Sequence, residues 1–326
     1  MNLLNRLNYL SRIGAAYCLP GRSQLSFWHE TPALHPDIDS TTLGPYYMTF
    51  ASKADYLGPF DAEGVPQLNY RGKLGLQYNP IAIAQYALGN YNRYLENKDA
   101  ARRGKFLHIA DWLVNHLEKN LAGLSVWNHH FNWEYRSPLV APWYSGLAQG
   151  QGISVLVRAH KDTGESRYLD AARLAFQTFL HPIEKGGVVL PDGKGRAWIE
   201  EYLVSPPTHI LNGFFWAVWG VHDFYLTTGD PAAKKVWNES VSTLVDALPT
   251  YDTGYWSLYE HSGTWLQMVA SPFYHALHIV QLRVMHQLTG AAVFAETADR
   301  WDGYRRSIFR RSRAWVQKAI FKLLYY

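Results

Sequence analysis

A hydrophobic pattern with helical spacing begins at Pro80 and recurs four times along the chain. Between positions 81 and 95 the apolar residues return every three or four positions, which predicts a helix opened by Pro80. Each of the four helices ends in a short turn that is followed at once by a second helix. The turns, counted from Lys98, Gly164, Gly229 and Gly290, are 66, 65 and 61 residues apart. Glycine suits the left-handed position that terminates a helix, so the pattern predicts four helical hairpins.

Hairpins that recur at a fixed period, with long inserts between them, are typical of an α/α toroid or solenoid. We therefore expect a mainly α protein, an (α/α) toroid with a small β-containing N-terminal arm and short strands in the inserts. An ordinary helical bundle would not need the spacing to hold four times. The predicted second helices are Ala101–Leu121, Ser166–Leu180, Ala232–Leu248 and Ala292–Tyr304.

The pattern also divides the chain. Residues 1–75 carry turn signals and short β-prone pieces such as Tyr46–Phe50, which predicts an N-terminal arm with short strands. Residues 76–306 form the predicted toroid. Residues 307–326 alternate basic and apolar positions, which fits an amphipathic helix that touches a membrane or a partner. A final helix packed on the ring fits equally well.

The inserts are the expected binding face. Residues Leu124–Tyr144, Gly186–Pro207 and Tyr251–Pro272 each connect one hairpin to the next, and such insertions usually emerge on one side of a repeat fold. Gly186–Leu190 and Trp256–Tyr259 are predicted to be short strands of hairpins within them.

Composition narrows the class of protein. Aromatic residues make up 15% of the chain, a content that suits an aromatic-rich core as well as a cleft in which sugar rings stack. The net charge of +4 is concentrated in the tail, so a nucleic-acid footprint is not expected. The single cysteine, Cys18, excludes an internal disulfide framework. No apolar run reaches the ~20 residues of a membrane span. We expect a cytoplasmic protein without a signal peptide, with peripheral membrane contact through the tail and a homodimer both left open.

Strong motifs for other chemistries are missing from the sequence. It contains no phosphate-binding glycine loop, no HExxH and no Cys/His zinc spacing, so we predict no metal site. Three insert segments instead bring together carboxylates, tyrosines and histidines: Glu200-Glu201-Tyr202, Tyr251–His261 and Ser271–His275. Taken alone, the carboxylates and tyrosines of each segment are typical of surface or helix-capping residues. Together, at the ends of successive hairpins, they predict an active site.

Several of these segments resemble motifs of one known family. Trp143–Ser154 resembles its W-Y-S-A-M-A-Q-G-Q-A-I-S, Leu248–Gly254 its L-P-x-Y-D-T-G, and Tyr274–Leu282 its Y-H-x-x-H-I-x-Q-L. Glu200-Glu201-Tyr202 with Leu211-Asn212-Gly213 resembles its E-E-Y-P…L-N-G, and Tyr78–Tyr86 also fits. The family is the D-glucuronyl C5-epimerases of heparan sulfate and heparosan modification, whose catalytic domain is an α/α toroid. The resemblance runs from about Tyr46 to about Tyr304.

This resemblance implies an isomerase that converts D-glucuronate to L-iduronate, or a related uronate, within a polysaccharide. One group removes the C5 proton and another reprotonates the opposite face, without a metal or other cofactor. The implied catalytic residues are Glu201, Tyr202, Tyr259 and Tyr274, with Glu201 or Tyr202 opposite Tyr274 and with Tyr259 holding the uronate. The implied substrate-binding residues are Asn212, His261, His275, Trp143, Tyr144, Gln149 and Tyr78.

One motif departs from the family. Members carry an arginine three residues after the tyrosine that matches Tyr259, whereas this chain reads Tyr259-Glu260-His261-Ser262. Arginine is a natural partner for a substrate carboxylate, and His261, Arg196 and Arg136 are candidates to replace it. A polysaccharide lyase or glycoside hydrolase on the same ring, and a catalytically inactive glycan-binding protein, are the alternatives.

Overall fold

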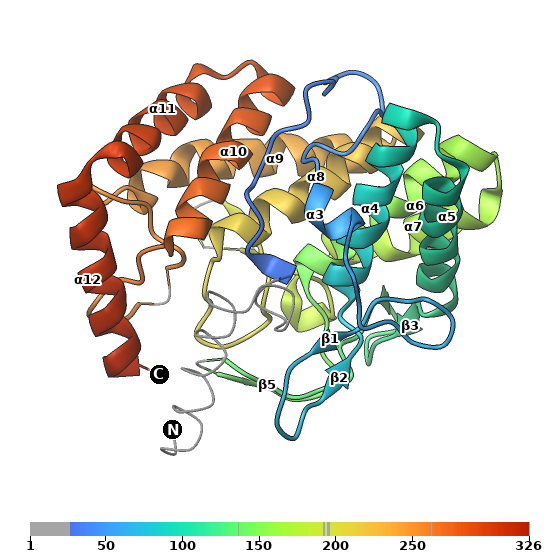
Figure 1. The fold of residues 1–326 in the computed structure, drawn as a ribbon, viewed down its shortest axis with the longest axis horizontal. Helices are drawn as coiled ribbons and strands as arrows, with labels where there is room; N and C mark the ends of the chain where they lie inside the picture. The colour runs from blue at the N-terminus through green and yellow to red at the C-terminus, as the bar shows by residue number, and fades with distance from the viewer. Residues whose placement is uncertain (1–26, 136, 192, 194–195, 262, 326) are drawn as a thin grey trace.

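The computed structural model describes residues 27–135, 137–191, 193, 196–261 and 263–325. Within them the main feature is a series of four helical hairpins, and the chain forms an (α/α) toroid (Figure 1). The hairpins pair α4 (Pro80–Asn97) with α5 (Ala100–Asn115), α6 (Gly146–Thr163) with α7 (Ser166–Phe176), α8 (Leu211–Thr228) with α9 (Pro231–Ala247), and α10 (Pro272–Thr289) with α11 (Ala292–Arg306). The prediction of a toroid of hairpins is confirmed.

The first helix of each hairpin belongs to an inner layer. Helices α4, α6, α8 and α10 contact one another in that order, and the first three are buried around their whole circumference over most of their length. The second helices lie outside, and α5 for example buries a single stripe that includes Phe106, Ile109 and Leu113. A helix that is apolar on all sides belongs in the interior, whereas one apolar stripe suits a helix with one face to solvent.

The four turns have the geometry that the sequence predicted. Gly164, Gly229 and Gly290 terminate α6, α8 and α10 in the left-handed region, with φ of 77°, 66° and 69°. Lys98 takes the same conformation at the end of α4, with φ of 55°. An aspartate, Asp99 or Asp230, then caps α5 or α9 by accepting hydrogen bonds from backbone N–H groups of the first turn.

Helices α6 and α8 approach each other more closely than side chains would normally permit. A Cβ at Gly150 would lie 2.5 Å from Cα of Ala217, so only glycine fits this crossing. A buried ion pair ties the same two helices, because Arg158 Nη1 lies 2.6 Å from Asp223 Oδ2 with both side chains fully buried. Ser154 also donates to that carboxylate.

The N-terminal segment joins this network. Tyr47 donates a hydrogen bond of 2.6 Å to Asp223, and Arg158 donates one of 3.0 Å to the carbonyl of Gly44. Phe50, at the start of α3 (Ala51–Ala54), is fully buried against Trp216. In Figure 1 this segment, drawn in blue, passes between α10 and α4 and so completes the ring on that side.

The strands of the described segments are short and form four separate antiparallel pairs. The pairs are β1 (Leu68–Asn69) with β2 (Leu76–Gln77), β3 (Glu118–Lys119) with β4 (Ser125–Val126), β5 (Trp133–Glu134) with β6 (Pro138–Leu139), and β7 (Val189–Pro191) with β8 (Ala197–Ile199). Short 3-10 turns, η1 (Gln177–Leu180), η2 (Ile183–Lys185) and η3 (Leu248–Tyr251), complete the inserts.

Three local predictions need correction. The helix predicted at Ala101–Leu121 ends at Asn115, because the following residues turn into the β3–β4 pair. Residues 46–50 form no strand, only the bridge between Leu34 and Met48. Trp256–Tyr259 likewise forms no strand pair, since Ser257 and Leu258 make isolated bridges to two different partners, Asp252 and Val269.

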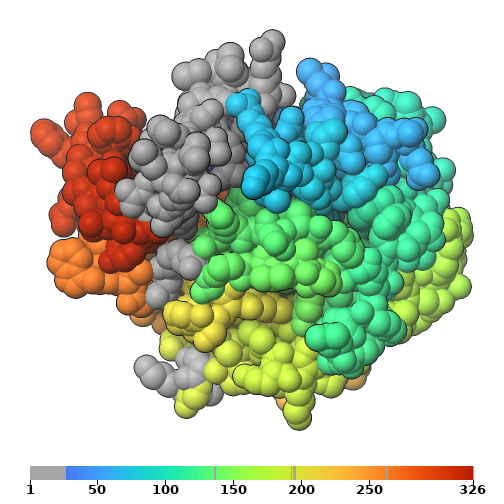
Figure 2. Space-filling view, turned by 90° about the horizontal axis from the view of Figure 1, so that it is seen from below, coloured from blue at the N-terminus to red at the C-terminus, as the bar shows by residue number. Residues whose placement is uncertain are grey.

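The tail predicted at 307–326 forms a further helix, α12 (Ile308–Tyr325). It packs against α11 and against the insert that precedes α10. Seen from below, the inserts gather on one face, with the described residues of 120–145 in green beside those of 185–210 in yellow-green and α12 in red at the edge (Figure 2). No helix in the described part of the chain is long and apolar enough to cross a membrane.

Candidate active site

Glu201 is held at the end of a strand and against the start of a helix. It follows β8, and the preceding Glu200 accepts a hydrogen bond of 3.0 Å from the backbone N–H of Gly146. Its side chain packs on Gly213 in the first turn of α8, where an added Cβ would lie 2.8 Å from Cβ of Glu201. Three elements therefore fix the position of this carboxyl group.

Burial changes the acidity of Glu201. The side chain is 6% exposed, and loss of hydration raises the pKa of its carboxyl group from 4.5 to about 8. A hydrogen bond from Tyr202 opposes the rise, and the nearby Glu200 and Glu260 add to it. The positive N-terminal end of α8 stabilises the carboxylate and therefore, like Tyr202, lowers the pKa of Glu201. Near neutral pH the group can therefore both release and accept a proton.

Tyr259 lies beside this carboxyl group. Its backbone N–H donates to Met268 and its carbonyl accepts from Leu211, the first residue of α8. Its ring meets that of Tyr274 edge-on, with the ring centres 4.8 Å apart. Burial, together with Tyr274, Glu201 and further neighbours, raises the pKa of Tyr259 well above its ordinary value. Tyr259 is therefore a neutral hydrogen-bond donor.

Tyr202 and Tyr274 complete the group that the sequence predicted. Tyr202 is half-buried and its ring lies 4.8 Å from that of Tyr135 and 5.8 Å from that of Trp143. Tyr274 lies in the first turn of α10, where Ser271 caps the helix by accepting a hydrogen bond from the backbone N–H of Tyr274. Glu201, Tyr202, Tyr259 and Tyr274 thus come together from two inserts and one helix start.

Three members of this cluster are not among the site residues predicted from the sequence. Tyr135, from the insert before α6, donates a hydrogen bond to Glu260. Tyr135 lies close enough to act electrostatically on Tyr259, and Glu260 lies close enough to act on Glu201. Lys318 of α12 places its ammonium group 5.5 Å from the centre of the Tyr259 ring and donates to the carbonyl of Val269. Glu260 is only 2% exposed, and its position directly after Tyr259 was the signal available in the sequence.

His275 is built into the interior. The ring is stacked on Trp256, with ring centres 3.7 Å apart, and Nε2 lies 3.0 Å from the carbonyl of Trp301. Its Nδ1 lies 2.8 Å from Oγ of Ser257, which also meets His278. Burial lowers the pKa of His275 to about 4, so the ring is neutral and fixes the insert that carries Tyr259.

Other predicted substrate contacts hold the inserts together. Gln149 is fully buried, and its Oε1 accepts from the backbone N–H of Trp127. Tyr144 donates to the carbonyl of Gly186. The ring of Trp143 is stacked on His129 and its edge faces Tyr202, so Trp143 belongs to the wall of the tyrosine cluster.

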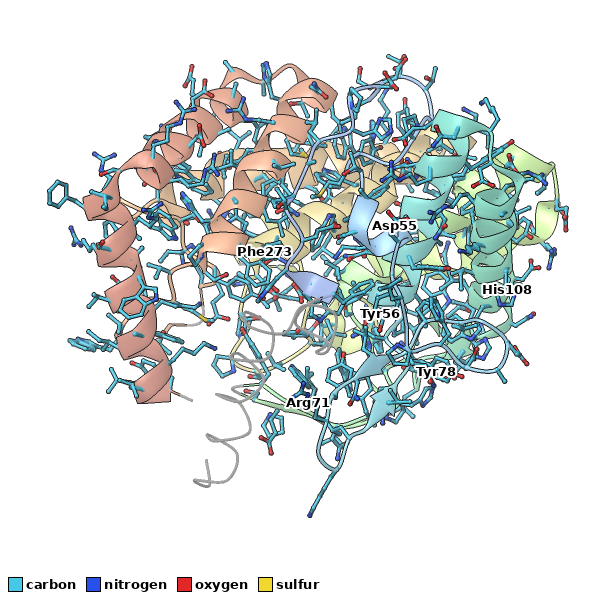
Figure 3. All side chains as sticks on the ribbon, viewed as in Figure 1. Asp55, Tyr56, Arg71, Tyr78, His108 and Phe273 are labelled. Carbon is cyan, nitrogen blue, oxygen red and sulfur yellow. The ribbon has the colours of Figure 1, made fainter. Side chains whose placement is uncertain are left out.

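The remaining predicted contacts divide into near and distant residues. Asn212 is buried in the first turn of α8, next to Gly213, and its Oδ1 has no hydrogen-bond partner among the described residues. His261 lies against Tyr251 and meets Thr250 at 2.9 Å. Tyr78 donates a hydrogen bond to Asp61 and lies near α5, at the right of the view, whereas Phe273 lies left of centre (Figure 3). The structure does not bring Tyr78 to the cluster.

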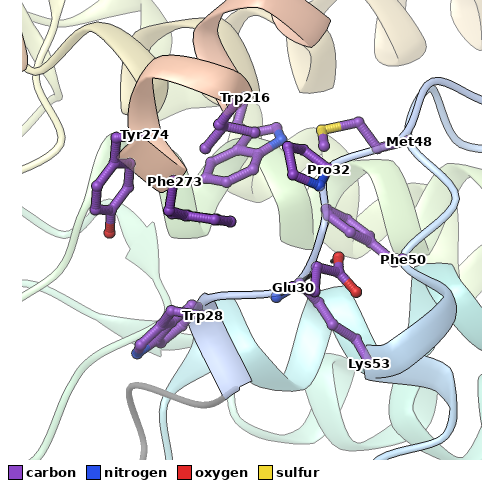
Figure 4. A pocket seen from close by; sticks show the side chains of 10 residues that line it. Trp28, Glu30, Pro32, Met48, Phe50, Lys53, Trp216, Phe273 and Tyr274 are labelled. Atoms are coloured by element: carbon purple, nitrogen blue, oxygen red, sulfur yellow. Dashed lines mark ion pairs between the residues drawn. The ribbon is translucent and has the colours of Figure 1, made fainter. Parts of the chain in front are cut away.

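A small hollow adjoins the cluster on the side of Tyr274 (Figure 4). Phe273 and Tyr274 line one side, and Glu30 and Lys53 line the other. Burial lowers the pKa of Lys53 to about 8, and Lys53 donates to the carbonyl of Phe27. The carboxyl group of Glu201 does not line this hollow, so we place the chemistry at the tyrosine cluster beside it.

Candidate cations and metal ligands are few. The described residues contain no group of three or more histidine, cysteine, aspartate or glutamate side chains that could hold a metal ion. Of the cations proposed to replace the family arginine, Arg196 lies close enough to act electrostatically on Tyr251, and Arg136 lies outside the described residues. Cys18 also lies outside them. Lys318 is the cation that the structure places at Tyr259.

Comparison with known sequences identifies the family, and three of the matches are described here. The sequence model described as D-glucuronyl C5-epimerase C-terminus matches residues 122–303, which is more than half of the chain. An uncharacterized protein of Methanocaldococcus jannaschii is 28% identical over 267 residues, covering 74% of this chain and 84% of that protein. The D-glucuronyl C5-epimerase of Caenorhabditis elegans is 33% identical over 214 residues, covering 61% of this chain but only 34% of its own length.

Comparison with solved structures supports the fold. The cellobiose 2-epimerase of Spirochaeta thermophila superposes with a TM-score of 0.54 at 12% identity, covering 93% of this chain and 86% of that one. That structure is of the α/α toroid type, and at this identity the likeness concerns the fold alone. Glu201, Tyr202, Tyr259 and Tyr274 all lie inside the range that the sequence model matches.

Proposed function

Because the chain belongs to the D-glucuronyl C5-epimerase family, we propose that it inverts C5 of a uronate within a polysaccharide. The substrate would be D-glucuronate and the product L-iduronate, or a closely related pair. The observation that carries this proposal is Glu201, a buried carboxyl group with a pKa of about 8 that lies among three tyrosines.

Glu201 would exchange the proton at C5. A carbon acid next to a carboxylate needs a base whose pKa lies near the working pH, since this favours both the correct protonation state and proton transfer. An exposed glutamate, with a pKa of about 4.3, would be too weak a base. Burial of Glu201 provides the stronger base, and Tyr202 would orient it through their hydrogen bond.

Tyr274 would deliver its hydroxyl proton to the opposite face of the carbon, and the resulting tyrosinate and the protonated Glu201 would then exchange protons with solvent to return to their starting forms. For this step the sugar ring must lie between Tyr274 and Glu201, with Tyr259 next to both groups. Tyr259 stays neutral, so its hydroxyl can donate a hydrogen bond to the substrate carboxylate. Such donors stabilise the negative charge that develops on the carboxylate as the C5 proton leaves.

Charge in the site fits this assignment. Lys318 supplies a positive group at Tyr259, where the family arginine is absent. Two carboxyl groups next to a uronate would repel it if both were ionised. Near neutral pH Glu201 is protonated in most molecules when the uronate binds, and it must release this proton before it can act as the base. Glu260 accepts a hydrogen bond from Tyr135. Both features reduce the negative charge that the substrate meets.

The test is proton exchange in heavy water. Purified protein is incubated with heparosan and other uronate polymers, and deuterium at C5 is measured by NMR. We expect deuterium at C5, growing L-iduronate signals and an unchanged chain length. Absorbance from an unsaturated uronate would instead show a lyase, and new reducing ends without it would show a hydrolase. Binding without exchange or cleavage would identify an inactive glycan-binding protein and refute the proposal.

A matched pair of variants makes the test specific to the site. Glu201→Gln keeps the shape of the side chain and removes the base, so exchange should fall by roughly 10²- to 10⁴-fold. Glu239→Gln, on the exposed face of α9, is the control and should exchange like the natural protein. Equal exchange by the two variants would exclude Glu201 as the base.

A further inference from the structure

The final helix presents an apolar stripe to solvent. Seven of the fifteen exposed large hydrophobic side chains in the described residues belong to α12. They recur at helical spacing, so they lie along one face for the length of the helix. They are Ile308, Phe309, Trp315, Val316, Ile320, Leu323 and Leu324.

The opposite face of α12 is fixed to the body of the protein. Phe321 and Ala314 are buried there. Gln317 donates a hydrogen bond of 2.9 Å to the carbonyl of Gln267, and Lys318 donates one of 2.8 Å to that of Val269. These contacts set the rotation of the helix, so the stripe cannot turn inward without breaking them.

The charges of α12 are all positive. The helix has five basic residues and no acidic one. On a helical projection Arg311 and Lys322 lie along one edge of the stripe. Arg313 lies along the other edge, where its guanidinium group stands 3.9 Å from the centre of the Tyr255 ring. An apolar face with tryptophan, phenylalanine and leucine between basic edges is typical of a helix that lies in the interface of a membrane.

We propose that α12 docks the protein on the surface of an anionic lipid bilayer. Eighteen residues give a helix about 27 Å long, and it stands at the outer edge of the molecule (Figures 1 and 2). A flat anionic surface can therefore meet the apolar stripe and the basic edges at the same time. This inference does not depend on the proposed reaction. It would place the candidate active site near the bilayer, because Lys318 joins α12 to Tyr259.

The experiment is flotation of the full chain with lipid vesicles. One vesicle contains phosphatidylcholine alone and the other contains equal parts of phosphatidylcholine and phosphatidylglycerol. We expect binding to the anionic vesicle at low salt, little binding to the neutral one, and loss of binding at high salt because the charges are screened. Arg311→Glu should weaken binding by roughly 25-fold, since it changes the charge by two units and each unit near an anionic surface contributes about fivefold.

Matched variants separate the stripe from general changes of the surface. Trp315→Ser combined with Leu323→Ser removes apolar area from the stripe and should weaken binding by at least about tenfold. Leu57→Ser combined with Leu121→Ser changes two side chains elsewhere that are even more exposed, and should leave binding intact. Lys105→Glu, on the exposed side of α5, is the control for Arg311→Glu. Circular dichroism of each variant checks that it is folded.

Three results would overturn the proposal. The first is no binding of the natural chain to the anionic vesicles at low salt. The second is equal binding by the stripe variant and its control, or equal binding to neutral and anionic vesicles. The third is a dimer in light scattering that the stripe variant converts to a monomer while no vesicle binding occurs, which would identify the stripe as an interface between two copies of the chain.

Discussion

Glu201 should make the stability of the protein fall as the pH rises. Its folded-state pKa of about 8 lies above the value of 4.5 expected for an unhindered side chain, so the folded state binds more protons between these two pH values. The stabilising effect of the protonated group is complete below about pH 4.5 and is lost as the pH rises to about 8. The cause is burial, which disfavours the carboxylate.

The size of the effect follows from the same two values. The interval from 4.5 to about 8, at about 1.4 kcal/mol per pH unit, corresponds to about 5 kcal/mol in the free energy of unfolding. The positive end of α8, at Gly213, favours the carboxylate and reduces this figure. We therefore expect an effect of about 3 to 5 kcal/mol.

The assay compares Glu201→Gln with the natural chain by urea unfolding, followed by tryptophan fluorescence, at a series of pH values. Glutamine does not ionise, so the variant should gain stability relative to the natural chain as the pH rises from about 5 to about 8. Glu239→Gln, which is exposed, should show no such gain. If the difference in unfolding free energy between Glu201→Gln and the natural chain were constant across this range, the raised pKa would be refuted.

Three further outcomes follow from the fold and the site. Asp223→Asn should lower the free energy of unfolding by about 3 to 5 kcal/mol in a urea titration, because it leaves the buried Arg158 without its charged partner; a loss below about 1 kcal/mol would show that the pair is dispensable. Gly150→Ala should cost about 1 to 3 kcal/mol in the same titration, because the added methyl group separates α6 from α8. Lys318→Gln should slow C5 exchange by roughly tenfold or more, whereas Lys318→Arg, which keeps the charge beside Tyr259, should restore most of it. If Lys318→Arg exchanged as slowly as Lys318→Gln, the hydrogen bond of Lys318 to the insert and not its charge would be what matters, and this role would be contradicted.

Much of the fold was accessible from local signals. Helical periodicity and the turn glycines Gly164, Gly229 and Gly290 predicted four hairpins because both signals act within a few residues. Local signals did not predict the structure correctly where contacts between residues distant in sequence determine it. Helical propensity continued past Asn115, yet the chain leaves the helix there because β3 finds a partner in β4. Trp256–Tyr259 was strand-like in sequence, yet its pairing is divided between two different segments.

The candidate site, like the fold, could be predicted from the sequence only in part. Motif resemblance identified Glu201, Tyr202, Tyr259 and Tyr274, and the structure places them together. Tyr135 and Lys318 were missed because they come from other inserts and from α12, and spacing along the chain does not show which side chains will meet. The pKa of Glu201 also depends on how deeply the folded chain buries it, which no motif specifies.

The contacts of the N-terminal segment have a consequence for how the chain folds during synthesis. Tyr47 finds its partners His222 and Asp223 on α8, which are 175 and 176 residues further along the chain. At a synthesis rate of about 5 to 20 residues per second, this delay is roughly 10 to 35 s. During that time the aromatic residues around Tyr47 lack the surface that later covers them. Contacts so distant in sequence form late, so we expect the closing of the ring to be the slow step, and the step most in need of protection from aggregation.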